Sequence, residues 1–433
     1  MKKVDCKRKT ILILLAQKRG YRNALKRWWR RIRKIQKVDS KKELRNSSLC
    51  HYYDRSVCSM GRKQPKNISR PEVPQNFSFI ENCEKTCIFL KDLVSSVQNN
   101  KTKKIYLDQS KCTNIDLCAE TVTAVLLKDI GDNYKIKLQG KYPDDYELKR
   151  IVCASGITKY LKVVNYNPED MCLFPIVKGR KVKSQANESP SKDIEAEKLI
   201  NYINECLNKC GWQIVKDSKA KFAKAFVEIL DNAEEHSQKI NWWITAYSKE
   251  LASKKIECHL VLFNFGISVY QSMQKLPLEN ALRTRIESLI KKHQIRHFFS
   301  KKWDDETLWT LYSLQEGSSR FYAQGEENKD RGQGLSDLIQ FFQEIGESDD
   351  GETPVMVMVS GNVYIKFDND YKIVKRNKNG NERRQIAFNH SNSLEVPPDK
   401  NKVMKLSSTF PGTLYSFKFI IDDKHLQKLQ KEK

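Results

Sequence analysis

One helix-forming segment in the second half of the sequence constrains the fold more than any other feature. Residues 221–238 read KFAKAFVEILDNAEEHSQ, and the apolar residues recur at spacings of three and four. This periodicity predicts an amphipathic helix that buries one face. Glu228, Asn232 and His236 follow at intervals of four, so they share a polar edge of that helix. The edge is either solvated or a Mg²⁺ site, in which Asn232 binds the ion and Glu228 orients or deprotonates a water.

Three further patterns follow this helix. Residues 259–264 (HLVLFN) predict a strand that ends at Asn264, and the chain then runs through Gly266 to Ser268. After a long polar insertion, residues 330–336 (DRGQGLS) open a helical pattern, and glycines at a helix N-terminus let the backbone approach a phosphate. Gly-Thr at 412–413 then leads into an alternating strand, LYSFKFII. The order of these patterns favours a nucleotide site.

In this order the patterns resemble the motifs of the GHKL ATP-binding superfamily. Its members include type II topoisomerase ATPase domains, mismatch-repair ATPases, large heat-shock chaperones, histidine kinases and anti-sigma-factor serine kinases. The resemblance covers about residues 195–421 and implies an α/β sandwich that binds ATP and Mg²⁺. It implies that Asn232 binds Mg²⁺ and that Glu228 is the catalytic residue that positions or activates the attacking water. The residues placed at the nucleotide are Asn232, His236, Asn264, Gly266, Arg331, Gly332, Gly334, Leu335 and Thr413.

Individual roles follow from the same resemblance. Gly332 and Gly334 would wrap the phosphates, and Thr413 would hydrogen-bond near the adenine. The family's Asp-x-Gly-x-Gly motif departs here, because it reads Asn264-x-Gly266-x-Ser268. Asn264 can accept a hydrogen bond from the adenine amino group, but without the charge that strengthens the bond made by the family's Asp. We therefore expect weaker adenine selectivity, and a tighter turn where Ser268 replaces glycine.

The insertion between residues 275 and 330 is long for an ATP lid. It contains a basic helical stretch and an aromatic stretch, at residues 283–297 and 303–322. Two interpretations stay open: a lid that orders on nucleotide, or a helical subdomain that packs on the body. Glu235 stands where many histidine kinases have a basic, phosphate-facing residue, and Arg320, Lys329 or Arg331 could supply that charge. His293 and His297 lie four apart and could share a helix face.

The middle of the chain predicts a second α/β domain, in which strands alternate with helices. The strands are expected at 104–107, 134–138 and 160–164, and the helices at 115–129 and 144–155. The run IYLDQSKCTNIDLCAETVTAVLL resembles the STAS fold of anti-anti-sigma factors, in which a Ser or Thr at the helix start is phosphorylated. Here Leu117 and Cys118 follow Asp116, so the phosphoacceptor is absent. The resemblance implies the fold and an unidentified protein partner, but no phosphosite.

The N-terminal arm carries most of the net charge of +25. Residues 1–70 contain 23 Lys/Arg and 4 Asp/Glu, whereas the remaining residues contain 55 and 49. This imbalance argues against a protein that coats nucleic acid over its whole surface. Residues 10–37 predict a basic amphipathic helix that includes Trp28 and Trp29. The arm (residues 1–37) either binds nucleic acid or another polyanion, lies on an anionic membrane, or docks on the body or a partner protein.

These patterns divide the chain into five parts. We expect a basic, partly helical or disordered arm (1–73), a STAS-like α/β domain (74–177), a linker (178–193), a GHKL-type ATP-binding domain (194–423) and a charged tail (424–433). No run approaches the roughly 18 apolar residues of a transmembrane segment, and no signal peptide is recognisable, so we expect a cytoplasmic protein. The 12 cysteines contain no CxxC pair. They are reduced and buried, or Cys50, His51 and Cys58 bind zinc.

The expected function is that of a Mg·ATP-binding regulatory protein. Its GHKL-type domain would act as an ATP-driven conformational switch or ATP hydrolase, coupled to the STAS-like domain. One alternative is an anti-sigma-like serine or histidine protein kinase. The histidine type is disfavoured because only one helix, without His, precedes the ATP-binding domain. The other alternative is a non-enzymatic nucleic-acid-binding regulator that uses the arm. The oligomeric state, including a homodimer, is left open.

Overall fold

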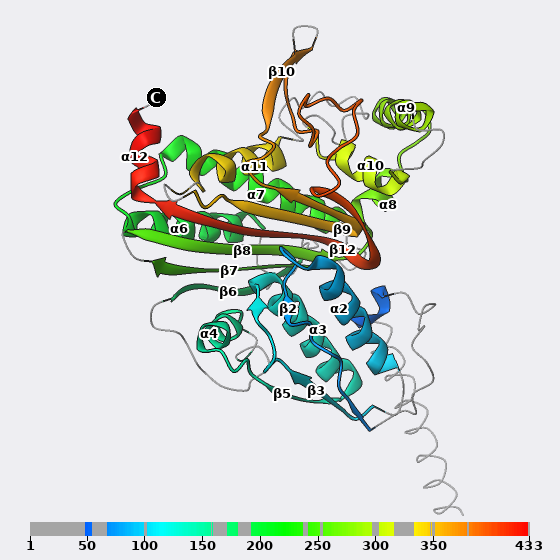
Figure 1. Ribbon diagram of the computed structural model, residues 1–433, viewed down its shortest axis with the longest axis vertical. Coiled ribbons are helices and arrows are strands. Elements are labelled where there is room, and N and C mark those ends of the chain that lie inside the picture. Colours follow the sequence, from blue (N-terminus) through cyan, green and yellow to red (C-terminus); the bar gives the residue numbers. More distant parts are fainter. Residues whose placement is uncertain are drawn as a thin grey trace, which may run out of the picture.

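The structure, a computed structural model, places helices and strands in four layers (Figure 1). These are a small sheet, a first helical layer, a large sheet and a second helical layer. The mixture of helices and strands confirms the expected α/β class. The described residues are 48–53, 67–98, 102–156, 158, 171–180, 192–236, 241–251, 254–296, 303–315, 333–346, 348, 351–378 and 381–431.

The large sheet has five strands in the order β6-β7-β8-β12-β9, and each neighbouring pair is antiparallel. The strands are β6 (Met171–Arg180), β7 (Asn241–Leu251), β8 (Lys255–Phe265), β9 (Val355–Phe367) and β12 (Val403–Asp422). Both faces are buried, because Leu260 and Leu262 on β8 face one apolar core whereas Val261 and Phe263 face another. The expected strands at 259–264 and 414–421 are confirmed as parts of β8 and β12.

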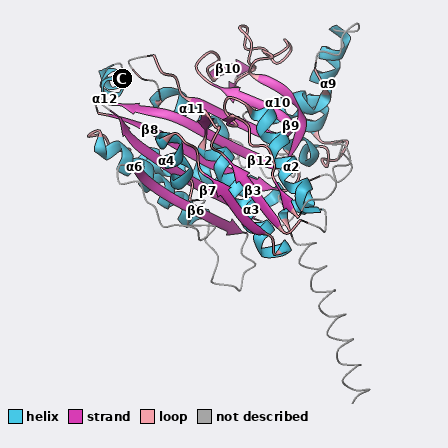
Figure 2. Cartoon of the chain, turned by 60° about the horizontal axis from the view of Figure 1, so that its bottom comes forward, coloured by secondary structure: helices cyan, strands magenta, loops and turns pink. Residues whose placement is uncertain are grey.

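Helices cover one face of this sheet, called the helix face below (Figure 2). They are α6 (Lys192–Lys209), α7 (Lys216–His236) and α11 (Gly334–Ile345), and α12 (Asp423–Lys431) follows β12 in what we expected to be the tail. On α6, Ala196, Leu199, Ile203 and Cys206 recur at helical spacing and are buried. The expected helices at 194–208, 221–238 and 335–345 are therefore confirmed, with ends that differ by a few residues.

The lid insertion is helical where it is described. It holds α9 (Ala281–Arg296) and α10 (Asp305–Ser313), and α8 (Val269–Met273) precedes it. Ile286 and Ile290 of α9 and Leu308 and Leu311 of α10 are buried in the same core as the helix face. Farther along the chain, β10 (Val374–Lys378) and β11 (Asn381–Gln385) form an antiparallel hairpin that projects from the top of the molecule (Figure 1).

The middle segment lies on the other face of the large sheet. The strands β1 (Ile68–Ser69), β3 (Lys104–Asp108) and β5 (Lys137–Lys141) form a parallel sheet, and β2 (Asn76–Phe77) pairs with β4 (Asn114–Ile115). The helices are η1 (Leu49–Tyr52), α2 (Cys83–Gln98), α3 (Leu117–Tyr134) and α4 (Tyr146–Ala154). Asp116 caps α3 by accepting from Ala119 N at 2.7 Å. Lys135 ends α3 at φ 57°, so β5 starts later than the strand expected at 134–138.

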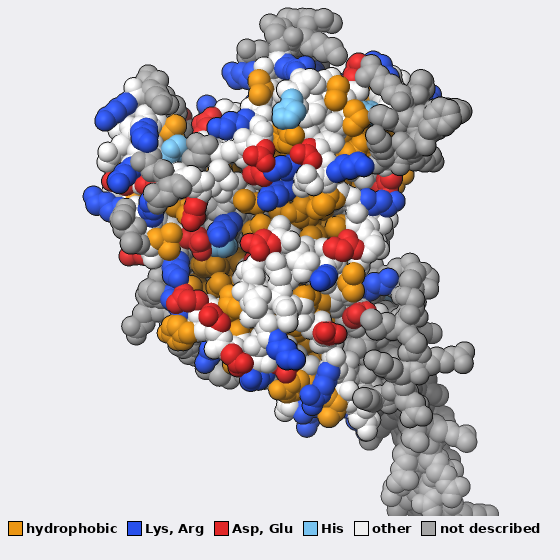
Figure 3. Space-filling model, in the orientation of Figure 1, with side chains coloured by type: hydrophobic (Ala, Val, Ile, Leu, Met, Phe, Trp, Pro, Cys, Tyr) orange, Lys and Arg blue, Asp and Glu red, His pale blue; other side chains and the backbone are white. Residues whose placement is uncertain are grey.

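One apolar core joins the middle segment to the large sheet. Phe79 meets Phe410 edge to face with ring centroids 6.1 Å apart, and Tyr364 Oη donates to Ile80 O at 2.8 Å. Figure 3 shows hydrophobic side chains along the junction of the two halves. The strand β6 also crosses the boundary expected at residue 177, because its ladder with β7 makes it part of the large sheet.

Several expectations concern residues outside the described part of the chain. They include the arm helix, the strand at 160–164, most of the linker, Cys58, His297, Arg320, Lys329, Arg331 and Gly332. None of the helices that the structure describes is long and apolar enough to cross a membrane.

Candidate functional site

Two of the predicted motifs meet where α7 and α11 cross. The backbone N–H of Gly334 donates a hydrogen bond to Glu228 Oε2 at 2.9 Å, although 106 positions separate the two residues. A Cβ on Gly334 would lie 2.8 Å from Glu228 Oε2 and 3.0 Å from the Cα of Ala225. Glycine is therefore required there by the close approach of the two helices. The arrangement puts the expected catalytic carboxylate at the N-terminus of the glycine-led helix.

The other two motifs meet on adjacent strands. Thr413 of β12 lies opposite Asn264 of β8 on one side and opposite Ser360 of β9 on the other. All three alternate with residues of the opposite core, so they point to the helix face. Ser360 Oγ lies 2.8 Å from Thr413 Oγ1 and accepts from Val269 N at 2.9 Å. We call Asn264, Thr413 and Ser360 the polar row.

Asn264 is the member of the row whose side-chain nitrogen has no partner among the described residues. It is 2% exposed, and its side-chain nitrogen makes no hydrogen bond within the described residues. Leaving a buried amide donor unsatisfied costs about 1–3 kcal/mol. A purine ring nitrogen is an acceptor of the kind this donor lacks, and the amide oxygen would accept from an exocyclic amino group. The chemistry of the row thus fits the edge of a nucleobase.

Gly412 explains why a glycine precedes Thr413. Its φ is +135°, and a Cβ there would lie 2.0 Å from the backbone oxygen of Asn264. The register of β12 against β9 shifts between Phe410 and Thr413. Gly412 thus allows β12 to pass close to β8 at an irregularity, which brings Thr413 into line with Asn264.

Ser268 corrects one expectation about the turn after β8. We expected a tighter turn, but Ser268 has a φ of −71° and is the N-cap of α8. Its Oγ accepts from Gln271 N at 3.2 Å, and its own N–H donates to Gln271 Oε1 at 2.9 Å. This capping box starts α8 at the position where the GHKL motif has its second glycine, so the backbone needs no strained turn there. Gly266 joins the turn to β12 by donating its N–H to Pro411 O at 3.2 Å.

Charge and exposure differ along the polar edge of α7. Asn232 is exposed and Glu228 is half-buried one turn before it, so Asn232 is accessible to an ion from solvent. Tyr415, on the helix face two residues after Thr413, is half-buried, and desolvation followed by the charge of Glu228 raises its pKa. Trp242, opposite Asn264 on β7, donates from Nε1 to Glu234 Oε1 of α7 at 3.1 Å. Helix α7 is thereby held against β7, the strand beside Asn264.

The remaining candidate residues divide into three groups. His236 is the last residue of α7, and Leu335 packs half-buried on the core of the helix face. Arg331 and Gly332 precede the described start of α11, so the structure does not place them. The predicted residues that it brings together are Glu228 with Gly334, and Asn264 with Thr413. Ser360 was missed, because no local pattern marks it and only the β9–β12 register brings it to the site.

Among the described residues, nothing supports the alternative metal sites at Cys50 or His293. Across the described ranges, no group of three or more His, Cys, Asp and Glu side chains is arranged to hold a metal ion. Cys50 is buried, and burial raises its pKa to about 12. His293 is buried with Nε2 2.9 Å from Leu394 O, which is a structural contact. Mg²⁺ keeps several waters and binds substrate phosphates, so it needs few protein ligands, and Asn232 and Glu228 are the polar groups that α7 offers.

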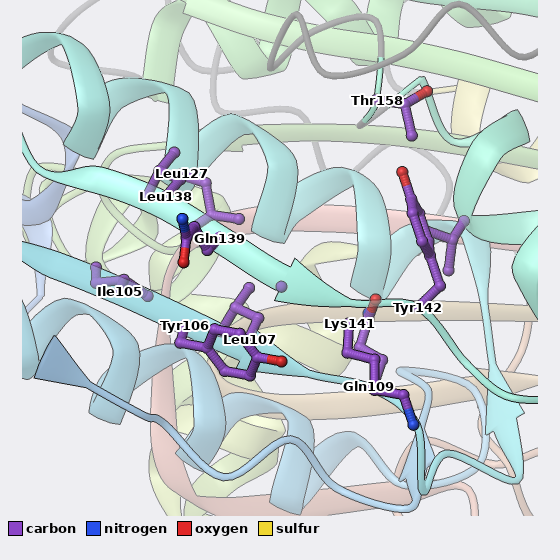
Figure 4. A pocket seen from close by; sticks show the side chains of 12 residues that line it. Ile105, Tyr106, Leu107, Gln109, Leu127, Leu138, Gln139, Lys141, Tyr142 and Thr158 are labelled. Atoms are coloured by element: carbon purple, nitrogen blue, oxygen red, sulfur yellow. The ribbon is translucent and has the colours of Figure 1, made fainter.

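A separate hollow lies in the middle segment (Figure 4). Its volume is about 410 Å³, and its lining is mainly apolar with polar groups from Gln109, Lys141, Tyr142 and Thr158. Such a size is typical of small-molecule pockets. The hollow is formed by β3, β5, α3 and α4, across the large sheet from Glu228 and the polar row. It is therefore not the site assembled from the sequence motifs.

Compared with protein-family models, curated proteins and solved structures, the chain matches none of them.

Proposed function

We propose that the chain is a Mg·ATP-binding regulatory protein with its nucleotide site on the helix face of the large sheet. One observation carries this proposal: four sequence motifs far apart in the chain meet there as two contacts, Glu228 with Gly334 and Asn264 with Thr413. Helix α8, just before the expected lid, borders the same end of the sheet, because Val269 N donates to Ser360 Oγ. Helix α10 of the insertion also contacts β9 there, because Asn362 N donates to Glu306 Oε1 at 3.2 Å. The arrangement supports a phosphate end at α7 and α11 and a base end at the polar row.

At the phosphate end, Asn232 would hold Mg²⁺, and the N-terminus of α11 would face the phosphates. Gln333 is the N-cap of α11 and makes no side-chain capping bond. The N–H groups in the first turn of a helix are suited to binding an anion. Glu228 accepts the Gly334 N–H in the structure. If that N–H turns to a phosphate oxygen, Glu228 is released to accept a proton from water. The contact would thus keep the carboxylate inactive until the site is filled.

At the base end, Asn264 offers one donor and one acceptor. Thr413 Oγ1 shares a hydrogen bond with Ser360 Oγ and can still contact a base. Residues flanking the row, Phe265 and Phe410, stack at 5.6 Å on the opposite face, where Phe410 meets Phe79 of the middle segment. A shift of the row on nucleotide binding would reach the middle segment through these rings. This packing supports a conformational switch read by a protein partner.

The test is calorimetric titration of ATP with and without Mg²⁺. Wild type should bind with Mg²⁺, and Asn232→Ala should weaken Mg²⁺-dependent binding by about 10- to 100-fold, as loss of a metal-supporting group does. The control is Asn201→Ala, another exposed Asn on a helix of the same layer. Absence of ATP binding by wild type would overturn the proposal.

Hydrolysis is tested separately with ATP labelled on the γ-phosphate. Glu228→Gln should retain nucleotide while turnover falls by about 10²–10⁴-fold, the usual contribution of a general base. Unchanged turnover would remove Glu228 from that role. Transfer of label to protein instead of water would favour the protein-kinase alternative.

A further inference from the structure

The β10–β11 hairpin is the most basic projection that the structure describes. Residues 372–385 contain six Lys/Arg and one Asp/Glu. Figure 1 shows the hairpin standing above the helical layer, and Figure 3 shows Lys and Arg side chains beside its tip. The hairpin projects away from the core and its charged side chains do not pack in it, so their positive charge indicates a role other than folding.

The pairing within the hairpin is electrostatically unfavourable. Lys375 lies opposite Arg384, and Arg376 lies opposite Arg383. Like charges placed directly across an antiparallel pair destabilise it. Successive pairs point to opposite faces of a ribbon, so both faces of the hairpin carry positive charge.

Contacts at its base hold the hairpin in place. Arg384 pairs with Asp337 in the first turns of α11, and Arg376 donates to Ser391 O. Gln385 Nε2 donates to Asn392 O. The hairpin is therefore held in place by the body, and these contacts offset the repulsion between its like charges.

Helix α9 brings a second set of positive charges to the same region. It contains five Lys/Arg and one Asp/Glu. Arg285 is exposed at the surface. Partial desolvation, and then the nearby charge of Arg383, lower the pKa of its guanidinium group. Two guanidinium groups from separate elements are thus held where they repel each other. An anion between them would relieve that repulsion.

Helix α9 is itself anchored. Arg283 donates to the backbone oxygens of Gln274 and Leu276, and Lys292 pairs with Glu395 at 2.6 Å. We call four residues of the two elements, the exposed Arg285, Lys375 and Arg376 and the half-buried Arg383, the basic ridge. Its two segments together contain 11 Lys/Arg and 2 Asp/Glu, whereas all of residues 71–433 contain 55 and 49. The net positive charge of the body is concentrated in these two segments.

We propose that the basic ridge binds the phosphate backbone of nucleic acid. A two-stranded ribbon has dimensions that the major groove of a duplex admits, and Arg presents a fork of donors that matches phosphate oxygens. An anionic membrane is a poorer fit, because surface-bound elements insert apolar side chains. Among the hairpin side chains that the structure describes, Val374 is the only large hydrophobic one that is strongly exposed. The ridge does not include Glu228, Asn232 or the polar row, so this inference stands apart from nucleotide binding.

The experiment measures fluorescence anisotropy of a labelled duplex of about 20 base pairs, and of its single strand, with the full chain between about 50 and 200 mM salt. The ridge variant combines Arg285→Gln, Lys375→Gln and Arg383→Gln. The control combines Lys85→Gln, Lys111→Gln and Lys137→Gln, which are exposed in the middle segment and remove the same charge. We expect the ridge variant to bind about tenfold more weakly or worse and its salt slope to fall by about 2–3, one contact per residue removed. The control should change both quantities far less.

Two additions keep the result interpretable. Both variants are repeated with Arg30→Gln, Arg31→Gln and Arg33→Gln, which lowers any contribution from the arm. Charge-preserving Arg285→Lys and Arg383→Lys should keep most of the salt slope, which excludes misfolding as the cause of a loss. Equal losses in the ridge and control variants would overturn the proposal. A second outcome would also overturn it: wild type binds phosphatidylserine vesicles but neither nucleic acid, and the ridge variant no longer binds the vesicles.

Discussion

At the scale of single residues, Glu120 is a carboxyl group enclosed in the middle segment. The Gln109 side chain donates to one of its oxygens, and the other has no partner among the residues described. Burial raises its pKa from 4.5 to about 8, although the Gln109 hydrogen bond acts in the opposite direction. The folded protein therefore keeps the proton where the unfolded chain has lost it. Stability falls as pH rises from the unfolded value to about 8, and changes no further above it.

Glu120→Gln should remove this pH dependence, because glutamine has nearly the same shape and does not titrate. The free energy of unfolding of wild type relative to the variant should fall by about 2–4 kcal/mol between about pH 5 and pH 8. Urea denaturation at the two pH values measures it. The exposed Glu205→Gln variant is the control and should follow wild type. A difference independent of pH would mean that Glu120 is ionised in the folded protein.

At the scale of elements, the crossing of α7 and α11 depends on the absence of a side chain at Gly334. Gly334→Ala should push the helices apart and cost about 1–3 kcal/mol, the usual price of overpacking. If the proposed function holds, the same variant should also weaken ATP binding. Urea denaturation gives the first effect and calorimetry gives the second.

The control for Gly334 is Gly131 of α3, where a Cβ would meet only Leu138 Cδ1 at 3.6 Å. Gly131→Ala should be neutral or stabilise the protein by up to about 1 kcal/mol, from helix propensity. Combining Gly334→Ala with Glu228→Ala should reduce the cost at Gly334, because the closest of the three contacts, Glu228 Oε2, is removed. An undiminished cost would locate the clash at the two contacts that remain, the Cα of Ala225 and the Cβ of residue 228.

The elements also show what could be predicted from sequence. Periodicity is a local property, so it predicted α7, α3 and β8 to within about five residues of their ends, and it predicted the second half of β12. Strand pairing is non-local, so nothing in the sequence marked Ser360 as a neighbour of Thr413, and β6 was divided by an expected domain boundary. The contact between Glu228 and Gly334 was expected only through the family resemblance. The basic ridge was missed because its two segments lie about a hundred positions apart.

At the scale of the whole molecule, the middle segment and the large sheet share one core. Phe410 is buried there between Phe79 and Phe265, at 6.1 and 5.6 Å between ring centroids. Separating the halves would expose this apolar surface to water, which is unfavourable in proportion to its area. We therefore expect the two halves to unfold as one cooperative unit.

Phe410→Ala tests this cooperativity, because its cavity lies between the halves. It should cost about 3–5 kcal/mol, the usual loss for a buried Phe. Tryptophan fluorescence reports the large sheet through Trp242 and Trp243, and hydrogen exchange of the α3 amides reports the middle segment. Both reporters should shift to the same lower denaturant concentration, whereas the exposed Val215→Ala should leave them unchanged. Protection of α3 that outlasts the fluorescence transition would contradict a shared unit.

If the transitions coincide, a ligand bound on the helix face must also stabilise α3, because any ligand that prefers the folded state stabilises the whole cooperative unit.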